Sequence, residues 1–476
     1  MATYIGLDLG TSSLKAILID EDETVLAEHT VPLSVQRPHD GWSEQDPASW
    51  AAAADAALAA LAGKADCSAL AGIGLSGHMH GATLLDAEDR VLRPCMLWND
   101  TRSAAQAARM DADPRYRAIT GNIVFPGFTA PKVEWVRETE PEVFEKIAKV
   151  LLPKDYLRLH LTGGHVTEMS DAAGTAWFDT GARDWSDALL ADCRLSRAQM
   201  PSLVEGSAVS GRLRGGFGLP QVPVAGGAGD NAAAAIGAGV VQDGTAFLSL
   251  GTSGVLFAAN DGYRPDPATA VHTFCHAVPG TWHQMGVILA ATDALEWLSR
   301  LTGQTAADLT RDLGPFQAPG RTLFLPYLGG ERTPHNNAAI RGQFLHLDHA
   351  TDAKAATRAV LEGVAYAFAD SRDALAATGT TIRQALAIGG GAKSAYWLEV
   401  LATTLGFALD VPRAGDFGAA LGAARLGRMA ATGAGAEIAT TPPIERTVTP
   451  DAGLTAAFAE GHARYRDSYQ ALKGLH

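Results

Sequence analysis

The chain has few of the features that mark secreted or membrane proteins. Its four cysteines are scattered and form no Cys-x-x-Cys pair: Cys67, Cys95, Cys193 and Cys275. Isolated cysteines are typical of reduced thiols, so a disulfide framework is excluded and a cytoplasmic location is expected. No apolar run approaches the roughly 20 residues that span a bilayer. Residues 1–4 carry no basic leader, so no signal peptide is expected.

Positive charge is also scarce. Lysine and arginine number 38 against 52 aspartates and glutamates, which gives a formal net charge of −14. Such an acidic chain argues against a broad surface for nucleic acid or anionic membrane. An anionic ligand would therefore need local hydrogen-bond donors. The 476 residues, 47% of them hydrophobic, are expected to form two globular domains rather than one core.

Two distant segments carry the same pattern. Residues 5–15 and 247–256 each read as an apolar strand, a Gly-Thr-Ser turn and a return strand. Glycine lets backbone approach a bulky anion, and the turn hydroxyls and N–H groups can donate to phosphate oxygens. Two such turns facing each other would hold a nucleotide polyphosphate from both sides, whereas ordinary hairpin turns are the alternative. The duplication predicts domains over 1–240 and 241–476.

Strand and helix signals alternate along both halves and predict an α/β fold. Asp46-Pro47 predicts a helix start by an aspartate N-cap and a proline in the first turn. Glycine-punctuated residues 71–77 predict a buried strand, and residues 83–92 a hairpin. Further elements are expected as a helix over 352–377, a strand over 385–388 and a helix over 394–406.

Two aspartates are the candidate catalytic residues. Asp230 follows the small residues 226–229 and precedes Asn231, so a substrate could come close to its carboxylate. There it would orient and deprotonate an attacking hydroxyl, as phosphoryl transfer requires, and a helix N-cap is the alternative. Asp8 precedes the first turn. Since Mg²⁺ prefers carboxylate, phosphate and water oxygens, Asp8 is expected beside the metal, and a turn-forming aspartate is the alternative.

Histidines and a glycine run supply weaker candidates. His78 and His80 are expected at the end of a strand and on one face of it, where they suit hydrogen bonding to a polyol better than metal binding. His272 and His276 are expected to be structural. The run 389–394, Gly-Gly-Gly-Ala-Lys-Ser, fits neither a Walker loop nor a Rossmann fingerprint. Its flat backbone could still stack against adenine or ribose.

Together these segments resemble the FGGY family of carbohydrate kinases, within the larger fold of actin, sugar kinases and heat-shock ATPases. The resemblance covers nearly the whole chain. Within the family, the chain is most similar to the members that phosphorylate D-xylulose. Its most specific strings are 42–47 (WSEQDP), 79–86 (MHGATLLD), 97–100 (LWND), 120–122, 126–132, 151–157, 170–175, 324–328 and 330–337 (GERTPHNN).

The resemblance implies two actin-like (ribonuclease H-like) ATPase domains with an interdomain cleft, the first on the sugar side and the second on the nucleotide side. It implies ATP-dependent phosphorylation of D-xylulose to D-xylulose 5-phosphate, with Asp230 as general base and a homodimer as the assembly. The implied sugar contacts are Met79, His80, Trp98, Asp230 and Asn231.

The resemblance also implies the nucleotide and metal contacts. Phosphates would be held by Gly10, Thr11, Ser12 and Lys15 on one side and by Gly251, Thr252 and Ser253 on the other. Adenosine would be bordered by Gly390, Gly391, Lys393 and Asp416. Mg²⁺ would arrive with ATP and lie near Asp8 and Asp230.

Three departures from the family pattern stand out. His78 replaces the glutamine that D-xylulose-specific members usually show, His346 replaces a glycine of the second family signature, and Thr139 departs at the end of the first. None of them falls on Asp230 or on the phosphate turns.

Three alternatives stay open. The same chemistry could act on another ketose or polyol, such as ribulose, gluconate or glycerol. An actin-like ATPase could use the nucleotide as a conformational timer, although such a protein has no need of the sugar-side strings. A sugar sensor without activity would be expected to lack Asp230 or one turn.

Overall fold

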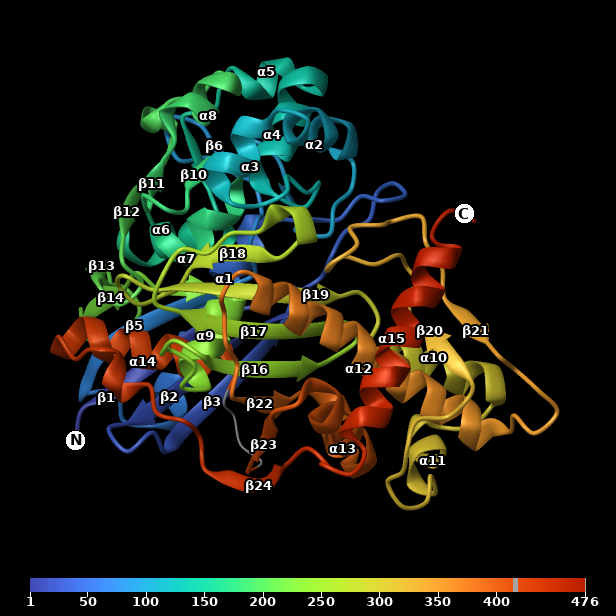
Figure 1. Ribbon diagram of the computed structural model, residues 1–476. Helices are drawn as coiled ribbons and strands as arrows, with labels where there is room; N and C mark the ends of the chain where they lie inside the picture. The colour runs from blue at the N-terminus through green and yellow to red at the C-terminus, as the bar shows by residue number, and fades with distance from the viewer. Residues whose placement is uncertain (414–417, 476) are drawn as a thin grey trace.

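The computed structural model describes residues 1–413 and 418–475, and its first sheet is built around the amino-terminal hairpin (Figure 1). β1 (Thr3–Leu9) pairs antiparallel with β2 (Ser13–Asp20), which pairs with β3 (Val25–Pro32). On its other side, β1 runs parallel to β5 (Leu70–Gly77). The sheet continues from β5 to β14 (Pro223–Ala225) and then to β13 (Val209–Arg212). The short strand β15 (Ala228–Gly229) pairs with the end of β5.

The second sheet repeats this plan around the second hairpin. β16 (Thr245–Leu250) and β17 (Gly254–Asn260) pair antiparallel across the second Gly-Thr-Ser turn. The parallel neighbour of β16 is β22 (Gln384–Ile388). Both predicted hairpins, and the strand predicted after residue 384, are thus confirmed. The sheet is completed by β18 (His272–Cys275), β19 (Trp282–Ile288), β23 (Ala408–Pro412) and β24 (Ile444–Val448).

Side-chain caps start the long helices where the sequence predicts them. Asp46 accepts a hydrogen bond from Ala48 N at α1 (Pro47–Lys64). Asp352 accepts from Ala355 N at α12 (Ala353–Ala377). At α13 (Ala395–Leu405), Ser394 caps the start and Gly406, with φ of 76°, ends the helix. Each cap satisfies a backbone N–H that a helix terminus leaves without an internal partner.

A lobe of short elements covers the carboxyl end of the first sheet (Figure 1). Its predicted hairpin over 83–92 is closed by a bridge between Leu85 and Val91. Its helices are α2 (Ala104–Asp111), α3 (Pro114–Thr120), α4 (Thr129–Thr139), α5 (Pro141–Phe144), α6 (Pro153–Thr162), α7 (Met169–Ala172) and α8 (Asp187–Asp192). Its strands are β6 (Thr83–Leu85), β7 (Cys95–Met96), β8 (Lys149–Leu151), β9 (Val166–Glu168), β10 (Phe178–Asp179), β11 (Asp184–Trp185) and β12 (Ser202–Val204). β4 (Glu44–Gln45), which lies earlier in the chain, pairs with β7.

The second half carries further helices on its sheet. They are α10 (Thr292–Thr302), α11 (Ala306–Arg311) and α15 (Thr455–Leu472), with a small sheet of β20 (Leu323–Leu325) and β21 (Gln343–Leu345). His346, just after β21, has a φ of 58°. This left-handed backbone favours glycine, which gives a physical reason for the family's glycine at that position. Within the described part of the chain, every helix is too short or too polar to cross a bilayer.

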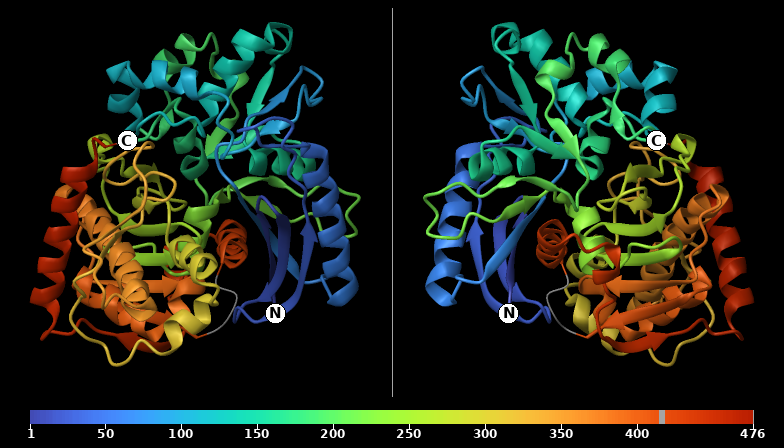
Figure 2. Two further views of the ribbon diagram at one scale, coloured as in Figure 1. Left: turned by 90° about the vertical axis from the view of Figure 1, so that its right-hand side faces the viewer. Right: turned by 90° about the vertical axis from the view of Figure 1, so that its left-hand side faces the viewer.

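One late helix returns to the first sheet. α14 (Ala419–Thr432) packs on β1, β5 and α9 (Asp230–Gly237), and Figure 2 shows it between the two sheets. Small residues permit the contact, because a Cβ on Gly6 would lie 1.9 Å from Ala420 O. The division at residue 240 therefore stays a prediction: it separates the strands of the two sheets but not this helix.

Candidate functional site

Three parallel strands bring the two candidate aspartates to one sheet edge. In register, Asp8 of β1 lies opposite Ser76 of β5, and Ser76 lies opposite Ala228 of β15. Ser76 Oγ donates to Asp8 Oδ1 at 2.9 Å. Asp230 follows β15 directly, at its carboxyl end. Since the carboxyl ends of parallel strands share an edge, residues more than 200 positions apart meet there.

Asp230 has the environment of a base. It is the first residue of α9, and Gly229 is the N-cap, so the alternative reading of Asp230 as a helix cap is wrong. Its Oδ1 accepts hydrogen bonds from Asn231 N at 2.7 Å and Asn231 Nδ2 at 3.0 Å. Burial, and then the charge of Asp8, raise the pKa of Asp230 to about 6. A carboxylate of that pKa accepts a proton more readily than an ordinary aspartate while remaining ionised near pH 7.

The first Gly-Thr-Ser turn is tightly closed. Gly10 N donates to Ser13 O at 2.9 Å, and Leu33 N donates to Ser12 O at 2.8 Å. Lys15 lies opposite Asp8 in the hairpin register. The Ser12 side chain is exposed, so its hydroxyl is available for a ligand.

Two side chains from distant segments hold Thr11. Gln45, which is fully buried, donates from Nε2 to Thr11 O at 2.7 Å and accepts from Trp50 Nε1 at 3.1 Å. Trp98 donates from Nε1 to Thr11 Oγ1 at 3.1 Å, and 50% of it remains exposed. Trp98, predicted as a sugar contact, thus also reaches the turn predicted to hold phosphate. The string WSEQDP contains Gln45, but nothing local in it indicates this contact.

The second turn is anchored through its carbonyl groups. Thr292, at the start of α10, donates from N and from Oγ1 to Gly251 O, both at 2.9 Å. Ala291 N donates to Thr252 O at 2.8 Å. Thr252 and Ser253 are exposed. Their hydroxyls therefore face solvent while the backbone is held in place.

The glycine run lies against this second turn. Gly389 has a φ of 89°, and a Cβ there would lie 2.7 Å from Leu250 O, so only glycine allows the chain to pass this close. A pocket of about 840 Å³ opens beside it, large enough for a nucleoside. Its lining includes Gly390, Gly391, Lys393, Thr292, Phe316 and Trp397. Asp416, also predicted to border adenosine, lies outside the described residues.

Met79 and His80 follow the end of β5. His80 Nδ1 bonds to Gly174 O over 2.8 Å, and its ring stacks on Phe128 with centroids 4.7 Å apart. Burial lowers the pKa of His80 to about 3, so the ring is neutral. Because Nδ1 must then donate to the carbonyl, Nε2 is the acceptor. Met79 is buried against Gly229, where a Cβ would lie 2.8 Å from Met79 Cγ.

The expected strand placement of the two histidines is wrong. Both lie beyond β5, and His80 has a φ of 69°. His78 is only 2% exposed and packs edge-on against Trp50 at 5.5 Å. His78 is therefore buried against α1, the helix that carries Trp50.

Arg332 is a candidate that the sequence interpretation missed. Its guanidinium lies 4.4 Å from the Phe125 ring centroid, and Nη1 donates to His272 Nε2 at 3.3 Å. Its charge is one of the causes that lower the pKa of His80, which places Arg332 near that ring. The string GERTPHNN was the only available signal. His272 thus contacts a cation, whereas His276 is structural, with Nε2 bonded to Val240 O over 2.9 Å.

The two aspartates suit a magnesium ion. Among the described residues, no group of three or more histidine, cysteine or acidic side chains gathers as a self-sufficient metal site. Asp8 raises the pKa of Asp230, so the charge of one carboxylate acts on the other. Mg²⁺ is commonly bound by one or two carboxylates together with substrate phosphates and water, which fits this donor set.

These features are what a phosphotransferase site would need, and the family comparison shows that class of protein. The chain belongs to the FGGY family of carbohydrate kinases: the N-terminal domain of the family matches residues 3–237 and the C-terminal domain matches residues 246–431. The predicted family, the two-domain actin-like α/β fold and the alcohol phosphotransferase class are thereby confirmed. Members of this class use ATP as phosphoryl donor.

Individual relatives match nearly the full chain. The xylulose kinase of Escherichia coli (strain K12) is 48% identical over 481 residues, 99% of each chain. A crystal structure of a "xyloylose kinase" from Brucella ovis covers 100% of both chains with 58% identity and a TM-score of 0.98. The glycerol kinase of Plasmodium falciparum, solved with ADP, shares the fold at 17% identity, with a TM-score of 0.91 and 98% of each chain covered.

Proposed function

We propose that this kinase phosphorylates D-xylulose at its 5-hydroxyl with ATP. Full-length similarity to xylulose kinases supports the substrate. The observation that carries the chemistry is Asp230, a carboxylate of raised pKa at the edge where β1, β5 and β15 end. An alcohol is a poor nucleophile until a positioned base takes its proton, and Asp230 supplies that base.

Each predicted contact has a role in this proposal. The sugar lies against Met79, His80, Trp98 and Asn231. His80 accepts from a sugar hydroxyl through Nε2, because its Nδ1 is engaged by Gly174. The γ-phosphate lies between the two Gly-Thr-Ser turns, which donate hydrogen bonds to the charge that spreads over its oxygens. The residues proposed for phosphate are Gly10, Thr11, Ser12, Lys15, Gly251, Thr252 and Ser253, and those for the nucleoside are Gly390, Gly391, Lys393 and Asp416.

Mg²⁺ is proposed to be held by Asp8 and Asp230 together with the phosphates. When bound, it neutralises charge on the phosphate oxygens. Asp8 is kept in place by Ser76 Oγ at 2.9 Å, so its carboxylate is oriented before any ion arrives.

A panel assay tests the proposal. ADP release is measured with D-xylulose, D-ribulose, gluconate, glycerol and no acceptor, each at saturating MgATP. D-xylulose is expected to give the highest kcat/KM and to stimulate ADP release well above the rate without acceptor. Preference for another polyol would contradict the substrate, and release independent of any acceptor would indicate a timer ATPase.

We further propose a cytoplasmic location and a homodimer. The four cysteines are free and buried, which suits a reducing compartment. Sedimentation velocity tests the assembly: a dimer should sediment as a species of twice the chain's 49.6 kDa.

A further inference from the structure

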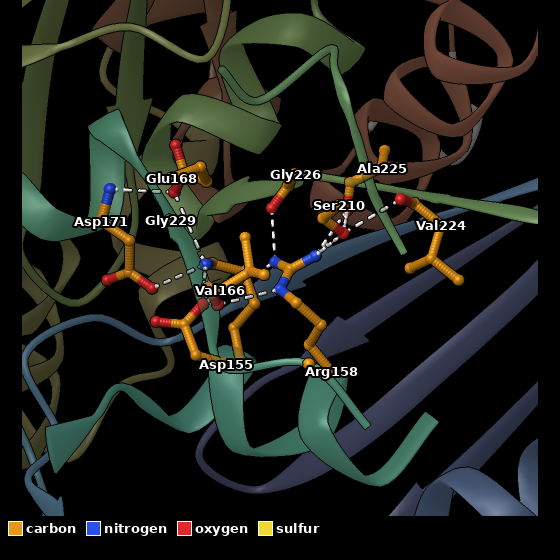
Figure 3. A network of polar contacts seen from close by, with 12 residues as sticks. Asp155, Arg158, Val166, Glu168, Asp171, Ser210, Val224, Ala225, Gly226 and Gly229 are labelled. Atoms are coloured by element: carbon orange, nitrogen blue, oxygen red, sulfur yellow. Dashed lines mark hydrogen bonds and ion pairs between the residues drawn. The ribbon is translucent and has the colours of Figure 1, made fainter. Parts of the chain in front are cut away.

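A buried ionic cluster lies directly behind the segment that carries Asp230 (Figure 3). Lys154, on α6, is fully buried. Its Nζ lies 2.6 Å from Asp155 Oδ1, 3.3 Å from Asp171 Oδ2 and 3.6 Å from Glu168 Oε1. Burial opposes the ammonium charge, but the three carboxylates outweigh it and raise the pKa of Lys154. The cluster therefore has a charged centre inside the fold.

A chain of hydrogen bonds runs from this cluster to the residue before Asp230. Glu168 accepts from Ser170 N at 2.7 Å and from Ser170 Oγ at 3.0 Å. Ser170 Oγ in turn accepts from Gly229 N at 3.1 Å. The single hydroxyl proton of Ser170 goes to Glu168, so its oxygen is free to receive the Gly229 proton. Both Glu168 and Ser170 are fully buried.

The same cluster holds the other end of this segment. Arg158 donates from Nη1 to Ala225 O at 2.6 Å and from Nη2 to Gly226 O at 2.5 Å. Residues 225–229, here called the strap, are thus tied at both ends, and Asp230 is the next residue. Figure 3 shows Arg158 pointing toward the carbonyls of Ala225 and Gly226.

The first part of the strap has backbone partners, because Gly226 N donates to Ala208 O at 2.7 Å and Gly227 N donates to Gly206 O at 2.9 Å. The five residues of the strap are glycine and alanine, so no long side chain packs to fix its course. Gly227 has a φ of 76°, and a Cβ there would lie 2.2 Å from Leu75 O. Strand pairing joins Ala228 and Gly229 to β5 on one side only. At the end of the strap next to Asp230, the hydrogen bond from Gly229 N to Ser170 Oγ ties the backbone to the cluster.

We propose that Ser170 is a positioning residue for catalysis, which sets the place of the Asp230 carboxylate through its hydrogen bond to Gly229 N. Lys154 and Glu168 support Ser170 from behind. The inference rests on the proposed role of Asp230 as base. Because a base must lie within hydrogen-bond reach of the hydroxyl, a small displacement of the carboxylate reduces turnover without abolishing binding.

Ser170→Ala tests this directly. The substitution leaves Gly229 N without its acceptor, so kcat with D-xylulose is expected to fall about 10- to 100-fold. The KM values for D-xylulose and for ATP should stay within about twofold, because no ligand contact is removed. Hydrogen exchange of a peptide that contains Gly229 should be faster than in the unchanged protein, since the amide loses its partner.

Ser210→Ala is the matched control. Ser210 Oγ also bonds to the strap, donating to Ala225 O at 2.9 Å, but at the end remote from Asp230. This variant should lose similar thermal stability yet keep kcat within about twofold. If both variants lose the same kcat, or if Ser170→Ala keeps full turnover, Ser170 has no positioning role.

The proposed function and the positioning role of Ser170 are contradicted by different results. If the unchanged protein shows no D-xylulose-stimulated ADP release, the proposed function is wrong, whereas exchange at Gly229 still reports the Ser170 contact. Full activity in the unchanged protein, combined with unaltered exchange at Gly229 in Ser170→Ala, would overturn the positioning inference alone.

Discussion

At the residue scale, the basicity of Asp230 is set by its burial and by a neighbouring charge. Desolvation disfavours the ionised carboxylate, and Asp8 adds repulsion, so the pKa rises to about 6. Asn231 lowers the pKa of Asp230, because it donates two hydrogen bonds to Oδ1. As a result, the Asp230 carboxylate is ionised near pH 7, and its pKa lies close enough to that pH for it to accept a proton.

The pH dependence of kcat/KM follows from this balance. The base must be ionised, so kcat/KM should fall tenfold per pH unit well below about pH 6, the pKa that burial and the charge of Asp8 give to Asp230. Asp8→Asn removes the repulsion and should move the acid limb of the residual activity to lower pH. An acid limb near the ordinary aspartate pKa in the unchanged protein would contradict the assignment of Asp230.

Trp98 joins two proposed subsites through one indole. Its N–H donates to Thr11 Oγ1, while half of the residue stays exposed. Trp98→Phe keeps an aromatic ring and removes the donor, so KM for ATP should rise roughly 2- to 10-fold, as expected for one hydrogen bond. Trp98→Ala should also raise KM for D-xylulose. Steady-state kinetics of the two variants measure the KM for ATP and the KM for D-xylulose separately. An unchanged KM for ATP in Trp98→Phe would show that the Thr11 contact does not contribute to ATP binding.

At the element scale, helices and hairpins form where local sequence favours them, but their partners are chosen by long-range packing. Caps at Asp46, Asp352 and Ser394 could be read directly because they act within a few residues. The packing of α14 on the first sheet could not be predicted in this way. It depends on glycines of distant strands that lie against small residues of the helix.

Gly6→Ala tests that packing. A Cβ would lie 1.9 Å from Ala420 O and 2.7 Å from Ala424 N, both backbone atoms that cannot move aside cheaply. The free energy of unfolding should fall by at least about 3 kcal/mol, the upper range for overpacking. Gly63→Ala is the control, since its Cβ in α1 would meet nothing within 4 Å. It should be neutral or stabilise by about 0.5–1 kcal/mol. Equal thermal stability of the two variants would contradict the packing account.

At the scale of the whole molecule, the proposed site draws on residues of both halves. The two hairpins could be predicted and Asp230 proposed from the sequence, because small residues and an aspartate stand out there. The contacts that place them could not be predicted: Gln45 on Thr11, Ser170 on Gly229 and Arg332 beside Phe125 join positions that no local pattern connects. The sequence also could not show that His78 is buried against Trp50.

Asp230 is proposed to deprotonate the sugar hydroxyl between two phosphate-binding turns. The decisive measurement is turnover of Asp230→Ala with D-xylulose and MgATP, alongside calorimetric binding of ADP. Loss of a general base predicts a kcat lower by roughly 100- to 10,000-fold with ADP affinity nearly unchanged. A variant that keeps the kcat of the unchanged protein would contradict the account.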